Sequence, residues 1–329
     1  MRAMALPLLP LLLVAGCDGA PPEVLRPDAG VPVIRDAATD AGTSGSCLAR
    51  GGALEVLRTL DNNVVTDHGG LITLDWGTSG QIAVASTDGA IKLWTVEGTS
   101  SGGLRAGAPV YDAAFGAGSP VVGALAYAPG ALWAGDETGR VVRYRTADLE
   151  PAFEATVTGA VRSLDARGER WAALADGLSV DGAEVSAPID APRAVALDDS
   201  GAWVVGAHGG QAALARIGGT PETVALEGAL VALAVEEGRL LAAGDGGVAI
   251  HDSEGTRVLG TEPSRGVAFA PGGDAVLVAE PGRVVARGLD GAELASVAVE
   301  GLVDVRAQPG RDHAVAIDDT GGIFVLGCR

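Results

Sequence analysis

The sequence predicts an all-β fold of seven repeated units, on three observations. Glycine supplies 50 of the 329 residues, about twice its usual share, which favours many tight turns over long helices. From about residue 70 onward, short apolar runs follow one another with glycine- or aspartate-containing turns between them. The pattern returns every 32 to 51 residues, and a period of about 40 is typical of the blades of a β-propeller.

Each repeat contains three such runs, which predict the three inner strands of a blade. A helical repeat would need longer apolar stripes at a spacing of about 3.6 residues. The longest interval leaves residues 99–121, rich in glycine and serine, as an insertion between the first two blades. The first runs are LITLDW (71–76), VGALAY (122–127), VRSLDA (161–166), RAVALD (193–198), LVALAV (230–235), RGVAFA (265–270) and LVDVRA (302–307).

Residues 1–16 are predicted to be an export signal. Arg2 precedes an apolar run that ends at Ala15, which is too short to span a bilayer. The segment Val14-Ala15-Gly16-Cys17 resembles the bacterial lipobox. This resemblance implies cleavage before Cys17 and lipidation of its thiol and amine, and several acyl chains give stable anchoring. The alternative is an ordinary cleaved signal in which Cys17 is incidental.

Residues 17–46 are predicted to be the lipidated cysteine and a disordered linker. Proline, glycine, aspartate, alanine and threonine dominate this segment without apolar periodicity, so it cannot bury enough surface to fold. A flexible chain of about 29 residues reaches roughly 30 Å. The expected organisation is therefore a signal peptide (1–16), a tether (17–46) and a propeller (47–329).

The two ends of the propeller predict how its ring closes. The seventh repeat finishes its third run at Leu326 without an outer strand, and one β-like segment, Ala53–Leu60, precedes the first repeat. Supplying that segment to the last blade would remove an exposed edge. Antiparallel pairing would then bring Cys47 to Cys328, and exported proteins oxidise such pairs. Closing this 281-residue loop is worth about 5 kcal/mol at most. Two free thiols or an intermolecular bond are the alternatives.

The first repeat resembles a WD40 repeat at the level of motif. In that family a histidine, a serine or threonine, an aspartate and a tryptophan form a hydrogen-bonded tetrad, and the matching residues here are His68, Ser86, Asp88 and Trp94. In the second repeat Thr138 replaces the aspartate, and later repeats lack the tetrad. The resemblance implies a rigid, non-enzymatic platform for proteins or peptides. It also implies a binding rim where the second strands end, at Asp136, His208, Asp245 and Glu280.

Charge limits the partners. Forty-two acidic side chains against 23 basic ones give a net charge of −19, which argues against nucleic acid and favours basic or neutral partner surfaces.

No cofactor or metal is expected. The four histidines are far apart in sequence and have no carboxylate or cysteine at metal spacing. The G-x-S-x-G string at 98–102 lies in a loop, and the paired acids before Ser-Gly and Thr-Gly are typical of turns. The inward-facing positions are expected to be mostly Ala, Val, Leu and Gly, with no repeated inward acid. That composition favours binding over catalysis.

Two function hypotheses follow. The first is a lipid-anchored, monomeric scaffold of the bacterial cell envelope that binds an envelope protein and reaches the bilayer through Cys17. A sensor or receptor domain cannot be separated from it by sequence. The second is an enzyme or a small-ligand or metal binder that resembles the quinoprotein or lactonase propellers.

Overall fold

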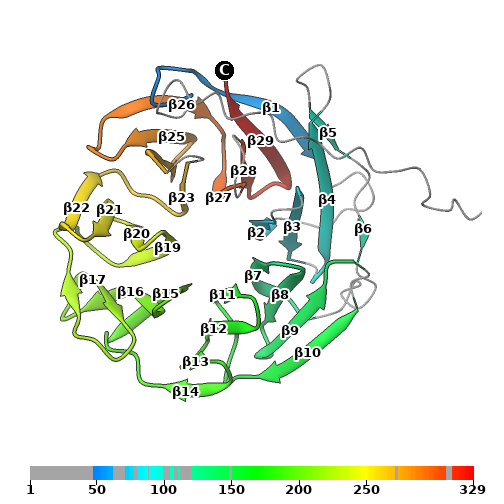
Figure 1. Cartoon of the computed structure of the whole chain (residues 1–329), viewed down its shortest axis with the longest axis vertical. Coiled ribbons are helices and arrows are strands. Elements are labelled where there is room, and N and C mark those ends of the chain that lie inside the picture. Colours follow the sequence, from blue (N-terminus) through cyan, green and yellow to red (C-terminus); the bar gives the residue numbers. More distant parts are fainter. Residues whose placement is uncertain are drawn as a thin grey trace, which may run out of the picture. The chain divides into compact units, whose positions relative to one another are not determined.

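A computed structural model describes residues 47–61, 71–77, 80–87, 89–98, 104–106, 110–111, 120–147, 150–270, 273–308 and 313–329. Every regular element in these ranges is a β-strand, and the strands form seven sheets. The sheets stand around a central axis as the blades of a propeller (Figure 1), which confirms the predicted fold class. The predicted signal peptide and tether, including Cys17, lie outside the described residues. No helix in the described part is long and apolar enough to cross a membrane.

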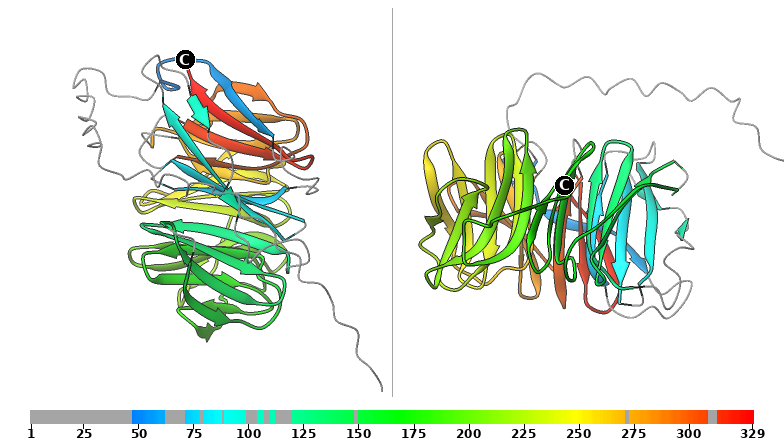
Figure 2. Two further views of the ribbon diagram at one scale, coloured as in Figure 1. Left: turned by 90° about the vertical axis from the view of Figure 1, so that its right-hand side faces the viewer. Right: turned by 90° about the horizontal axis from the view of Figure 1, so that it is seen from below.

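In six blades the strands run in sequence order from the channel to the periphery, and in the seventh β27, β28 and β29 are followed by β1; neighbouring strands are antiparallel (Figures 1 and 2). The innermost strands are β2 (Leu71–Trp76), β7 (Val122–Ala128), β11 (Ser163–Arg167), β15 (Ala191–Asp198), β19 (Leu230–Glu236), β23 (Val267–Phe269) and β27 (Leu302–Ala307). The second strands are β3 (Gln81–Ser86), β8 (Ala131–Asp136), β12 (Arg170–Leu174), β16 (Gly201–His208), β20 (Arg239–Gly244), β24 (Ala275–Glu280) and β28 (His313–Asp318).

The two outer positions of each blade complete the sheets. The third strands are β4 (Ile91–Gly98), β9 (Arg140–Arg145), β13 (Leu178–Val180), β17 (Gln211–Arg216), β21 (Gly247–Asp252), β25 (Arg283–Gly288) and β29 (Gly322–Cys328). The outer strands are β5 (Leu104–Ala106) with β6 (Val110–Tyr111) in the first blade, then β10 (Pro151–Thr156), β14 (Ala183–Val185), β18 (Glu222–Thr223), β22 (Gly255–Gly260), β26 (Glu293–Ala298) and β1 (Leu54–Asp61).

The hydrophobic core lies between neighbouring blades, because the middle strands are buried on both faces. Every residue of β8 and of β24 is buried. Trp133 and Trp171 come from adjacent blades, and their ring centroids lie 6.2 Å apart. The prediction that the tryptophans belong to the blade core is confirmed for four of the five, and Trp203 is half-buried.

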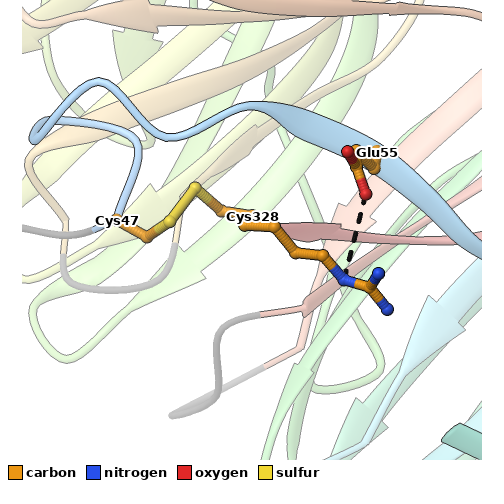
Figure 3. The surroundings of a disulfide bond; sticks show 4 residues. Cys47, Glu55 and Cys328 are labelled. Carbon is orange, nitrogen blue, oxygen red and sulfur yellow. Dashed lines mark ion pairs between the residues drawn. A yellow bond between two sulfur atoms is a disulfide. The ribbon is translucent and has the colours of Figure 1, made fainter. Parts of the chain in front are cut away.

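The ring closes through β1, as predicted. β1 pairs antiparallel with β29, from Leu54 opposite Cys328 to Asp61 opposite Gly322. Cys47 and Cys328 form a disulfide with their Cα atoms 5.9 Å apart, and Arg329 lies 3.8 Å from Glu55 on the same seam (Figure 3).

A glycine makes room for this bridge. A Cβ on Gly52 would lie 2.4 Å from each of the two sulfur atoms, so no larger residue fits there while the bridge is intact.

Removing the bridge is expected to destabilise the ring without changing its fold. The variant Cys47→Ser/Cys328→Ser should lose about 2–5 kcal/mol of unfolding free energy, because its unfolded chain is no longer cross-linked. Urea denaturation followed by tryptophan fluorescence measures this loss. A reductant should lower the stability of the parent and leave the variant unchanged. Equal unfolding free energies of the oxidised parent and the variant would show that the disulfide does not stabilise the closed ring.

Candidate binding site

The four predicted rim residues all lie at one end of the propeller, where the second strands end, but they differ in what they do there. His208 and Asp245 reach the surface, and the Nδ1 atom of His208 lies 3.2 Å from the Oδ1 atom of Asp190. Asp136 and Glu280 are buried at 3% exposure. Of the four predicted residues, His208 and Asp245 therefore contribute to the surface of this rim, and Asp136 and Glu280 do not.

The buried pair holds turns and strands in place. The Oδ1 atom of Asp136 accepts hydrogen bonds from the backbone and hydroxyl of Thr138, at 2.9 and 2.7 Å, and from the backbone of Arg140. Glu280 accepts from Arg283 at 2.7 Å and from Arg287 at 2.5 Å. Both oxygens of Glu280 are thus bonded to arginines, and Oδ1 of Asp136 fastens its turn, so the bonds of this buried pair are structural.

The predicted WD40 tetrad is described only in part. Ser86 and Trp94 are buried, and the Ser86 hydroxyl lies 3.4 Å from the carbonyl oxygen of Ala90. His68 and Asp88 lie outside the described residues, so the tetrad stays a prediction.

The turn of the second blade contains the same chemical pair in reverse order. There the acid, Asp136, precedes the hydroxyl, Thr138, and accepts its hydrogen bond. Asp318 and Thr320 repeat this arrangement in the seventh blade, with the hydroxyl at 2.9 Å. The interpretation of the paired acids as turn residues is confirmed here and at Asp198, whose Oδ1 atom accepts from Ser200.

A central channel of about 1190 Å³ runs between the innermost strands, and its wall is charged. The expectation that no acid recurs at the inward-facing positions is wrong, because Asp75, Asp165 and Asp304 line the channel together with Arg306. The strand pairings place Asp75, Asp165 and Arg306 at one equivalent position of β2, β11 and β27. In the sequence these aspartates stand as Leu-Asp in the runs LITLDW and VRSLDA and as Val-Asp in LVDVRA.

Two of the aspartates join neighbouring blades. The Oδ2 atom of Asp75 accepts a hydrogen bond from the backbone of Tyr127 at 2.5 Å, and that of Asp165 accepts from Leu197 at 2.6 Å. In both cases the Oδ1 atom accepts from the next residue of the same strand, at 2.9 Å. Each carboxylate thus satisfies backbone N–H groups on the open edges of two innermost strands.

Arg306 offsets the charge of these groups. Its guanidinium lies 3.1 Å from Asp304 and donates to the carbonyl oxygen of Val267 at 3.4 Å. Burial raises the pKa of Asp75 to about 6 although Arg306 lowers it, and burial also raises the pKa of Asp165 and of Asp304. Burial would lower the pKa of Arg306, but the three carboxylates outweigh burial and raise it.

Among the residues described, no group of three histidine, cysteine, aspartate or glutamate side chains could hold a metal ion. His208, His251 and His313 lie on the strands of three different blades.

Comparison with known proteins places the fold. No family model and no curated protein matches the sequence. The WD40 β-propeller domain of Doa1 matches the structure with a TM-score of 0.65 and 14% identity, over 83% of this chain and 97% of that one. The WD40 repeats of RRP9 match at 0.64 and 16%, over 84% and 99%. The β-propeller domain of Cps50 (Swd1) from Myceliophteria thermophila matches at 0.62 and 14%, over 83% and 99%. The chain therefore has the fold of a seven-bladed β-propeller, and this fold is similar to that of WD40 domains.

Replacing Arg306 is expected to make stability more dependent on pH. In the folded protein the channel carboxyls hold protons above the ordinary pKa of 3.8, so unfolding free energy falls as pH rises from about 4 to about 6. Arg306→Met removes the cation that lowers these pKa values and deepens the fall. We expect a loss of roughly 2 kcal/mol at about pH 7.5 and a clearly smaller one at about pH 4.5.

Urea denaturation at the two pH values tests this, with Arg306→Lys as the control that keeps the charge. A loss of the same size at both pH values would show that Arg306 acts through packing alone.

Proposed function

We propose that this chain is a binding module of the bacterial cell envelope: an exported, lipid-anchored, monomeric propeller that presents one end of its channel to another envelope protein. One observation carries the proposal. The acids that could have formed a catalytic site in the channel, Asp75 and Asp165, each have both oxygens bonded to backbone N–H groups. Their role is to hold the blades together, and a rigid ring with an open channel mouth is suited to recognition.

A small-ligand or enzymatic role is the second candidate, and the channel itself favours it. The channel has a volume of about 1190 Å³ and contains Asp75, whose pKa is raised to about 6. Perturbed carboxyls in a cavity are a common mark of functional sites. Native mass spectrometry of the purified protein distinguishes the two candidates, because a retained small molecule would favour the second.

The anchoring part of the proposal predicts acylation at one residue. Cells grown with alkyne-tagged palmitate should label the parent protein, and Cys17→Ser should abolish the label because no thiol remains to carry the lipid. The variant Cys47→Ser/Cys328→Ser is the matched control and should keep the label. An ordinary cleaved signal would instead leave all three proteins unlabelled.

The binding part predicts a specific partner. Cross-linking in intact cells, followed by affinity purification of the full chain and mass spectrometry, should recover one envelope protein reproducibly. Substitution at the channel mouth should reduce this recovery, whereas substitution on the outer strands should not. Failure to recover any partner, together with a retained small molecule, would replace the scaffold with the second candidate.

A further inference from the structure

Arginine recurs at one position of the channel mouth. This position lies one residue before β11, two residues before β23 and near the start of the other innermost strands. It carries Arg162, Arg193 and Arg265 in the third, fourth and sixth blades. The remaining blades have an uncharged residue there, so no acid faces the arginines from an equivalent position. All seven residues line the channel: Ile72, Gly123, Arg162, Arg193, Val231, Arg265 and Val303.

A β-bulge lies at this position in five blades, and Arg193 is the one of the three arginines that occupies such a bulge. The register shifts there by one residue, for example between Pro192 and Ala194 and between Leu230 and Ala232. Such bulges leave one residue unpaired and re-aim its side chain. Arg193 is the extra residue in its blade, and Val231 is the extra residue in the next, where it is 38% exposed.

These arginines also differ from the others in their contacts. Most arginines in the described ranges pair with a carboxylate, as Arg140 does with Glu154 at 2.9 Å and Arg257 with Asp252 at 2.6 Å. Within the part of the chain that the structure describes, Arg193 and Arg265 make neither a side-chain hydrogen bond nor an ion pair. Arg162 donates only to the carbonyl oxygen of Ala175. All three side chains are exposed, so their donors are available to a ligand.

The interior of the channel limits how far an anion can enter. Asp75 and Asp165 lie further along the innermost strands than the arginines, and Arg306 compensates only part of their charge. A negative group is therefore attracted at the mouth and repelled deeper in the channel. The site fits an anionic side chain presented at the surface, with Val231 as an apolar contact beside it.

We propose that Arg162, Arg193 and Arg265 form a receptor for carboxylate side chains of an acidic peptide segment. The inference rests on the proposed function and specifies its partner, which presents glutamate or aspartate to the channel mouth. The planar guanidinium matches a carboxylate through two parallel hydrogen bonds. Local charge thus selects a partner that the net charge of the chain would disfavour.

The direct test measures binding of a fluorescein-labelled octaglutamate peptide to the purified full chain by fluorescence anisotropy. The variant Arg193→Gln/Arg265→Gln should bind at least about tenfold more weakly, because it removes two charged donors. The variant Arg140→Gln/Arg257→Gln changes the net charge equally on the outer blades and should bind within about twofold of the parent. Both pairs are surface residues, and thermal unfolding confirms that each variant is folded.

Three outcomes would overturn the site: no peptide binding by the parent, equal weakening in both variants, or binding of phosphatidylglycerol vesicles in place of the peptide. Cross-linked capture separates the site from the proposed function. A partner captured equally by the parent and by Arg193→Gln/Arg265→Gln would overturn the carboxylate site and leave the binding module standing. A parent that captures no partner would overturn the binding module itself.

Discussion

Ring closure is the constraint on which the rest of this structure depends. Each blade packs only against its two neighbours, so a ring that is open at one point has two exposed faces and no fixed diameter. The chain solves this by taking the outer strand of the last blade, β1, from the beginning of the domain. Backbone pairing with β29 and the Cys47–Cys328 bridge hold the same seam. The width of the channel, and hence any site in it, is fixed there.

A closed ring creates a second problem, because seven strand edges face the channel. Backbone groups on those edges have no neighbouring strand, and water or side chains must satisfy them. Asp75 and Asp165 supply acceptors that reach the next blade. Their burial has a cost, visible in the raised pKa of Asp75, and Arg306 offsets it. The charges of the channel interior are therefore explained by the architecture before any ligand is considered.

The sequence predicted what is repeated and local, and missed what depends on contacts between blades. The strand period, the donated strand and the cysteine pair follow from spacing and from the two ends of the domain. Asp75 bonds to Tyr127, 52 residues away, and nothing in the run LITLDW indicates that partner. The equivalence of Arg162, Arg193 and Arg265 was also missed, because it depends on the register of the strands. Arg193 and Arg265 open their predicted runs whereas Arg162 is second in its own, and only the strand pairing shows that the three positions are equivalent.

Net charge and local charge act on a partner at different distances. The net charge of −19 repels an acidic protein at long range, but salt screens this repulsion beyond about 8 Å at physiological ionic strength. The unpaired arginines act at contact, where charged hydrogen bonds form and screening is weak. An acidic surface without the right shape is thus repelled and finds no compensation, whereas a segment that reaches the channel mouth gains contacts that exceed the repulsion. The acidic exterior and the basic mouth together select for close fit over general charge attraction.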